Sequence, residues 1–539
     1  MAARWEDIVK TKREARTKSL APYLAETLDV HDSITSIDDV DELVKGISTG
    51  RWTAQHVISA YIKRATEAHQ QTNCLTEIFF DQALERAARL DEYHLKHGKL
   101  MGPLHGVPIT LKDQFDVEGY DSTIGYVSRA LRPAKEDAAL VRILNDLGAV
   151  IIAKTNLPQS IMVMSPLQVI YTSYSHVQWC ETENPIWGLT VNPLNKDFTP
   201  GGSSGGEGAL LALQGSIIGY GTDLGGSVRI PSHINGLYGL KPTASRLPYH
   251  GLAVSTDGQA HVPSSVGPMA RNLSTLITVM KHTIRSKPWI LDPNVAPIEW
   301  QDKAFEDIQS RPLTIGILVD DGVVKIHPPI ERALRDLEAK LKTAGHEIVP
   351  WSSSGHKECI EIMDLFYSAD GGEDIRTEVT AGGEPFIPHV ETLINRGTAI
   401  SVYDYWQLNK RKVAAQQSYN KKWNATTGAS GRAVDVVLMP TMPHVAVPHR
   451  SCRWVGYTKI WNVLDYTALS FPAGKVDGRI DLKPRGSYEP RNEMDAWNWS
   501  LYDPETMHGH PIGLQIAGRR FEEEKVLGAA LVIEKLLKS

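Results

Sequence analysis

Two serines in glycine-rich segments are the residues best suited to chemistry in this chain of 539 residues. Ser203 lies in TPGGSSGGEG (199–208), and Ser227 ends GTDLGGS (221–227). A single segment of this kind is more often a plain turn or loop, but the presence of two makes that explanation weaker. Glycines also let backbone N–H groups converge beside a nucleophile and hold a developing oxyanion. The predicted donors of this kind are Leu224, Gly225, Gly226 and Ser227.

Lys112 is a third candidate, because it ends an alternating apolar run formed by Val107, Ile109 and Leu111. The alternation predicts a strand, and a lysine at the end of a strand is usually an exposed charge. A buried lysine differs, because desolvation lowers its pKa from ~10.4 toward ~7–8, or roughly 4 kcal/mol for ~3 units. If it is buried, Lys112 is therefore a candidate base.

Two other chemistries compete for the glycine-rich segments. Phosphate binding fits poorly, since neither segment ends in Gly-Lys-Ser/Thr and no G-x-G-x-x-G lies between a strand and a helix. The nucleophile elbow G-x-S-x-G is matched by GGSSGG for either Ser203 or Ser204. An elbow needs a later acid and then a histidine, for which Asp503 with His508 or His510 are nominal candidates.

Composition and charge exclude several classes of protein. The chain is 42% hydrophobic and 22% charged, which is typical of a globular protein. Its net charge is −6 and no Lys/Arg block stands out, so we expect no nucleic-acid partner. No stretch approaches the ~18 apolar residues of a membrane span, so we expect a cytoplasmic protein. Cys74, Cys180, Cys359 and Cys452 are far apart, which predicts buried thiols and no metal site.

Helical and strand patterns alternate along most of the chain. Residues 1–70 are predicted to be helical, with Ser36 and Asp39 capping one helix and Thr53 capping the next. Further on, helix-spaced apolar residues alternate with short apolar runs, which predicts a parallel or mixed sheet covered by helices in one large α/β unit. The predicted helices lie at 137–147, 330–341 and 522–537, and the predicted strands at 149–153, 313–319, 433–439 and 512–518.

Six motifs resemble those of the amidase signature family of serine hydrolases, and within it the fungal acetamidase-like amidases and fatty acid amide hydrolases. The resemblance runs from about residue 36 onward and is weaker over 275–510. The motifs are GPLHGVPITLKD (102–113), AKTNLPQ (153–159), GGSSGGEGAL (201–210), GTDLGGSVRIP (221–231), GLYGLKPT (236–243) and HPIGLQIAGRRFEEEKVL (510–527). The resemblance implies an amidase signature fold, a twisted mixed β-sheet with helices on both sides, over residues 71–539 after the helical segment 1–70.

The resemblance also implies a Ser-Ser-Lys triad. Lys112 matches the family's lysine, Ser203 the bridging serine after a glycine with a cis peptide bond, and Ser227 the nucleophile that forms an acyl-enzyme. Ile161 falls in a segment that lines the substrate pocket in the relatives, and Ser204 is a candidate supporting hydroxyl. Asp223 and Arg229 flank the nucleophile and are interpreted as structural partners for its loop.

The leading function is hydrolysis of carboxylic acid amides to an acid and ammonia or an amine, with no metal or organic cofactor. The alternatives are the glutaminase subunit of a transfer-RNA amidotransferase, which acts with a partner protein, and an inactive amide-binding homologue. A small-molecule amide is the expected partner, and a homodimer is left open. We expect the acyl preference to depend on residues 50–100, 365–410 and 450–505.

Residues 163–178 depart from the family pattern as an extra segment between AKTNLPQ and WCETENP. A valine codon begins GT, a glutamine codon can be CAG, and the segment keeps the reading frame. We therefore hypothesise a retained intron, with a real surface loop as the alternative. A transcript that retains these codons would refute the intron.

Overall fold

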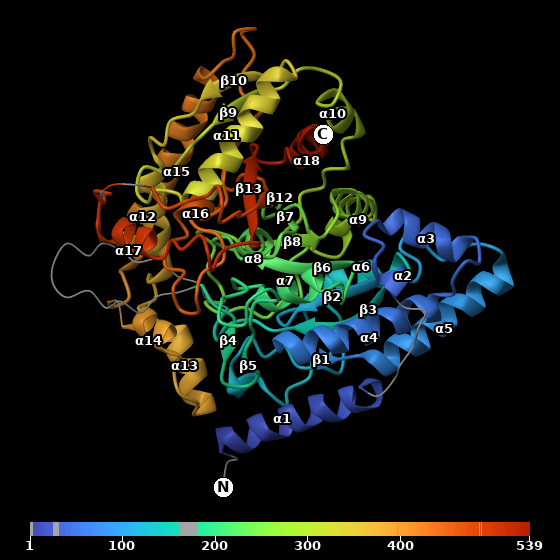
Figure 1. Ribbon diagram of the computed structural model, residues 1–539. Coiled ribbons are helices and arrows are strands. Elements are labelled where there is room, and N and C mark those ends of the chain that lie inside the picture. Colours follow the sequence, from blue (N-terminus) through green and yellow to red (C-terminus); the bar gives the residue numbers. More distant parts are fainter. Residues whose placement is uncertain (1–3, 25–31, 162–179, 396, 485, 487) are drawn as a thin grey trace.

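The computed structural model describes residues 4–24, 32–161, 180–395, 397–484, 486 and 488–539, so the segment 163–178 lies outside the described residues. Eleven strands form one sheet through the centre of the described chain (Figure 1). In sheet order they are β1 (Leu75–Ile78), β3 (Val150–Thr155), β2 (Pro108–Lys112), β6 (Ile218–Asp223), β8 (Ser265–Ala270), β7 (Tyr238–Lys241), β12 (Ala468–Lys475), β13 (Pro511–Ala517), β11 (Val436–Pro440), β9 (Thr314–Ile317) and β10 (Glu347–Pro350). A separate short ribbon pairs β4 (Glu183–Asn184) with β5 (Gly188–Leu189).

The sheet is mixed, which is one of the two arrangements that the alternating pattern predicted and the one that the family resemblance implied. Strand β2 is parallel to both β3 and β6, and β9 is parallel to both β10 and β11. The remaining pairs are antiparallel. The parallel pair β2–β6 matters for function, because the carboxyl ends of both strands lie at one edge of the sheet and carry Lys112 and Asp223 there.

Helices surround the sheet. Their bounds are α1 (Trp5–Leu20), α2 (Asp32–Thr35), α3 (Val40–Ser48), α4 (Ala54–Thr72), α5 (Phe80–His97), α6 (Ala139–Asp146), α7 (Gly205–Ala212), α8 (Arg229–Asn235), α9 (Leu273–Arg285), α10 (Asp302–Asp307), α11 (Pro328–Thr343), α12 (His356–Tyr367), α13 (Glu373–Gly382), α14 (Pro388–Ile394), α15 (Val402–Ala425), α16 (Gly456–Val463), α17 (Glu493–Ser500) and α18 (Glu523–Lys538). The predicted helices at 137–147, 330–341 and 522–537 correspond to α6, α11 and α18.

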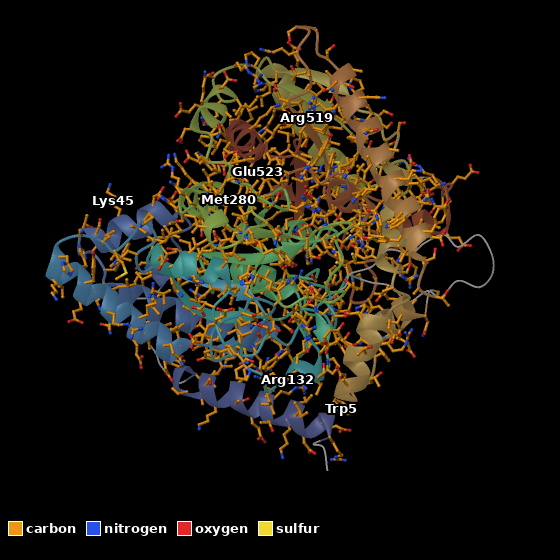
Figure 2. The ribbon with its side chains drawn as sticks, turned by 180° about the vertical axis from the view of Figure 1, so that it is seen from behind. Trp5, Lys45, Arg132, Met280, Arg519 and Glu523 are labelled. Atoms are coloured by element: carbon orange, nitrogen blue, oxygen red, sulfur yellow. The ribbon has the colours of Figure 1, made fainter. Side chains whose placement is uncertain are left out.

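Successive residues of β6 assign the helices to the two faces of the sheet. A methyl group built on Gly219 would collide with Glu207 of α7, so Gly219 faces that helix. The next residue, Tyr220, points the other way and its hydroxyl lies 3.5 Å from Thr283 of α9. Helices α4, α7 and α8 therefore cover one face, and α9, α11 and α18 cover the other. In the reverse view, Met280 of α9 and Glu523 of α18 lie near the middle of the molecule (Figure 2).

Local capping explains where the first core helices begin. The Asp39 side chain accepts hydrogen bonds from Asp41 N and Glu42 N at the start of α3. Thr53 accepts from His56 N and forms a capping box at the start of α4, so this predicted cap is confirmed. The predicted cap by Ser36 is wrong, because Asp39 is itself the cap residue of α3 and the Ser36 hydroxyl donates to the Ser33 carbonyl at 3.1 Å. Helix α4 then contributes fully buried residues to the main core, including Ile58.

All four cysteines are buried and free, as predicted. Within the described ranges, no cluster of three or more His, Cys, Asp or Glu residues is arranged to hold a metal ion. Among the helices of those same ranges, none is long and apolar enough to cross a membrane.

Candidate active site

Lys112 is buried at the carboxyl end of β2. Its Nζ donates hydrogen bonds to Ser203 Oγ at 2.7 Å and to Thr222 Oγ1 at 2.9 Å. Burial lowers the pKa of Lys112 to about 7, although the negative charge of Asp223 acts in the opposite sense. The ordinary expectation of an exposed terminal lysine is therefore wrong here, and the amine is largely neutral at a pH a little above 7.

Thr222 and Gln114 orient the amine of Lys112. The single hydroxyl proton of Thr222 is donated to Gln114 Oε1 at 2.6 Å. Thr222 can consequently only accept from Lys112, which commits one N–H of the amine to that contact. Gln114 is itself held by the Ala253 carbonyl, to which its Nε2 donates at 3.2 Å. When the amine is neutral, its lone pair is free to face Ser203 instead.

Ser203 is buried between β2 and the start of α7. The Gly202–Ser203 peptide bond is cis, as the family resemblance implied. Gly202 has no room for a side chain, because a methyl group there would lie 2.4 Å from the Glu181 carbonyl oxygen. This tight packing leaves the Ser203 hydroxyl beside Lys112.

Ser227 lies just before α8 and is 8% exposed. The Ser204 N–H donates to the Ser227 carbonyl at 3.2 Å, which ties the two glycine-rich segments together. Ser203 and Ser227 both line one cavity of about 720 Å³. The structure thus brings Lys112, Ser203 and Ser227 to one place, with Ser227 open to that cavity.

Asp223 and Arg229 organise the loop that precedes Ser227. Both side chains are fully buried, and Arg229 Nη2 lies 2.9 Å from Asp223 Oδ1. The carboxylate also accepts from the Gly226 N–H at 2.8 Å and the Val228 N–H at 3.2 Å. The charge of Arg229 lowers the pKa of Asp223 to about 2 against the opposing effect of burial. These contacts agree with the predicted structural role of Asp223 and Arg229.

The same contacts revise the predicted set of oxyanion donors. Because the Gly226 N–H is already bonded to Asp223, it is not available to a substrate. Across the described residues, no acceptor is found for the N–H groups of Leu224, Gly225 and Ser227. All three residues line the cavity of Ser203. The available donors are therefore three of the four that the sequence predicted.

Helix α16 and strand β13 anchor this loop through residues that the sequence analysis missed. Asn462 Nδ2 donates to Asp223 Oδ1 at 2.9 Å, and Asn462 Oδ1 accepts from Arg229 Nη2 at 2.8 Å. Gln515 Oε1 accepts from Arg229 Nη1 at 3.2 Å. Thr458 Oγ1 donates to the Gly225 carbonyl at 2.6 Å. These contacts span more than two hundred positions of the sequence, and no local motif signals them.

The two remaining predicted site residues lie in different environments. Ile161 lines the cavity, in agreement with its predicted place in the pocket wall. The Ser204 hydroxyl is buried and has no hydrogen-bond partner among the described residues, and it packs against Gly221, where a methyl group would lie 2.4 Å from it. Ser204 does not line the cavity and so acts through its backbone rather than as a substrate contact.

The nucleophile-elbow alternative is wrong. His508 accepts from the Gly478 N–H at 3.1 Å, and the His510 ring stacks on Phe198. Among the described residues that line the cavity of Ser203 and Ser227, neither histidine appears, and Asp503 is also absent. The acid and the histidine that an elbow needs are therefore not assembled beside either serine.

Residues 244–264 form much of the cavity wall, and the sequence analysis did not identify them as a source of specificity. A second cavity of about 430 Å³ adjoins the first and shares Leu224, Tyr367 and the segment 256–259 with it. Its other walls come largely from 363–374 and 400–405, in agreement with the expected segment 365–410. No described residue from 50–100 lines either cavity, so that part of the expectation is wrong.

The Amidase family model matches residues 56–527, so the chain belongs to the amidase family. It is accordingly a hydrolase of amides. The chain is 55% identical to amidase 1 of Gibberella moniliformis, over 100% of both chains. It is 37% identical to the acetamidase of Emericella nidulans, over 100% of this chain and 99% of the relative.

The fold has a close counterpart among solved structures. A fatty acid amide hydrolase superposes with a TM-score of 0.86 at 33% sequence identity, covering 100% of this chain and 91% of that one. The comparison confirms the amidase signature fold that the motifs predicted, with a large mixed sheet and surrounding helices in one α/β unit.

Proposed function

We propose that the chain hydrolyses carboxylic acid amides through an acyl-enzyme on Ser227, with Lys112 as the base and Ser203 as the proton bridge. The observation that carries this proposal is the hydrogen bond from a buried lysine with a pKa of about 7 to Ser203, in the cavity that also contains Ser227. A lysine tuned to this range can accept a proton at neutral pH and return it later.

In the first half-reaction, neutral Lys112 takes the proton of Ser203 while Ser203 takes that of Ser227. The oxygen of Ser227 bonds to the amide carbon, and the carbonyl electron pair moves onto oxygen. The N–H groups of Leu224, Gly225 and Ser227 stabilise that oxyanion.

Collapse of the intermediate breaks the carbon–nitrogen bond. The ammonium of Lys112 returns its proton through Ser203 to the leaving nitrogen, which departs as ammonia or an amine. Water then attacks the acyl-enzyme by the same relay and releases the acid and free Ser227. Every proton is accounted for within the triad and the water.

The relatives that match over their full length are named amidase and acetamidase, which supports this function over a transfer-RNA amidotransferase subunit. The test is turnover of a series of amides from acetamide to oleamide. Ser227→Ala and Lys112→Ala are expected to lose turnover nearly completely. Substantial residual hydrolysis by Ser227→Ala would remove Ser227 as the nucleophile.

A further inference from the structure

Tyr367 lies where the two cavities meet. It is the last residue of α12 and lines both cavities. A methyl group built on Gly225 would lie only 2.5 Å from its phenolic oxygen. The hydroxyl of Tyr367 therefore lies directly against the loop whose N–H groups face the substrate.

Helix α16 fixes Tyr367 and Gly225 relative to one another. The Lys459 Nζ lies 5.1 Å from the centre of the Tyr367 ring and forms a buried ion pair with Asp364. The neighbouring residue Thr458 donates to the Gly225 carbonyl at 2.6 Å. One helix thus holds both the phenol and the loop, which keeps the hydroxyl in a defined position.

The Tyr367 hydroxyl can donate a hydrogen bond to a ligand in the cavity. Burial raises its pKa well above the ordinary value, and the negative charges of Asp364 and Asp223 act in the same direction, so the phenol stays protonated. Tyr367 is 8% exposed, and no hydrogen bond from its hydroxyl to another described residue is found. Because Tyr367 lines both cavities, its hydroxyl can donate to a ligand oxygen there without giving up a hydrogen bond within the described chain.

We propose that Tyr367 is a further catalytic residue, whose hydroxyl donates a hydrogen bond to the carbonyl oxygen of the bound amide. The inference rests on the proposed function. It complements the revision above, because Asp223 has taken the Gly226 N–H and the phenol supplies an additional donor. The phenol keeps its proton throughout: the new bond is the one from Ser227 to carbon, and the phenol only stabilises the negative charge that this bond creates on oxygen.

Tyr367→Phe removes the hydroxyl and keeps the ring. We expect kcat to fall about 10²-fold, within the range known for loss of one oxyanion donor, while KM changes less than threefold. Affinity for a boronic acid, which mimics the tetrahedral intermediate, should fall in parallel with kcat/KM. The control Tyr61→Phe changes a buried tyrosine of α4 outside both cavities and should leave all three quantities unchanged.

Gly225→Ala tests the same contact from the other side. The added methyl group displaces the Tyr367 oxygen, so kcat should fall in the parent chain. In a Tyr367→Phe background the nearest ring atom is 3.8 Å away, an ordinary contact, so the same substitution should cost little more. The two losses are expected not to add. Gly225→Ala also remains informative if Tyr367→Phe fails to fold.

Three results would overturn the inference. One is a Tyr367→Phe enzyme with the kcat and boronic acid affinity of the parent, and another is a rise in KM alone. The third is full additivity in the pair with Gly225→Ala. In each case the parent still hydrolyses amides, so the proposed function survives. A parent that hydrolyses no amide and is not labelled at Ser227 refutes both proposals.

Discussion

Lys112→Met tests whether burial has tuned this lysine as the structure indicates. Methionine has a similar length and no charge, so the substitution removes the titrating amine and keeps most of the packing. The pKa of Lys112 is about 7 in the folded chain and ~10.4 in an unfolded one. Between these values the unfolded chain binds one more proton than the folded chain, so the parent gains stability as pH rises.

The size of this gain follows from linkage. The slope is about 1.4 kcal/mol per pH unit well above the folded pKa and half of that at pH 7, so the gain is about 2 kcal/mol from pH 7 to pH 9. Unfolding entropy of about 1 kcal/mol/K for a chain of 539 residues converts this to about 2 °C in Tm. Lys112→Met lacks the gain, so its Tm relative to the parent should fall by about that amount over this interval.

The assay is the Tm of both proteins measured by scanning fluorimetry at several pH values. Other titrating groups are common to the two chains and cancel in the difference. Lys10→Met replaces an exposed lysine of α1 and should show a Tm difference that does not change with pH. A difference for Lys112→Met that stays constant from pH 7 to pH 9 would show that Lys112 keeps its proton and cannot be the base.

Two further outcomes concern turnover. The rate of amide hydrolysis should rise with pH about a midpoint near 7 as Lys112 loses its proton, and a flat profile from pH 5 to 9 would contradict a lysine base. Asn462→Ala removes the amide that holds Asp223 and Arg229, so kcat should fall about 10-fold through a misplaced loop. If the folded variant has the same kcat as the parent, the position of the loop does not depend on Asn462.

The residues predicted from sequence share one property: each belongs to a local motif. Lys112 follows an alternating run, and Ser203 and Ser227 each lie among glycines, so neighbouring residues identify them. The cap at Thr53 was predictable for the same reason, because the cap and its partner His56 lie within three positions. Element type and the mixed sheet followed from periodicity, which is also a local signal.

The rest of the site depends on contacts between distant segments. The sheet order places β12 beside β7, and α16 precedes β12, so Thr458 and Asn462 reach the Ser227 loop from far along the chain. Helix α12 packs on α16 and places Tyr367 against the same loop. Neither composition nor residue spacing predicts the order of the strands in the sheet. The hydrogen bond from the Gly226 N–H to Asp223 was equally unpredictable from sequence, because it depends on how the turn folds back onto Asp223.

The central claim is that Ser227 is an activated nucleophile, and the most direct test is intact mass after exposure to a fluorophosphonate probe. The parent should gain the mass of one phosphonyl group, localised to Ser227 by peptide mapping. Ser227→Ala should gain none, while Tyr61→Phe should react like the parent. A folded parent that stays unlabelled, or a Ser227→Ala protein that is still labelled, would contradict the account.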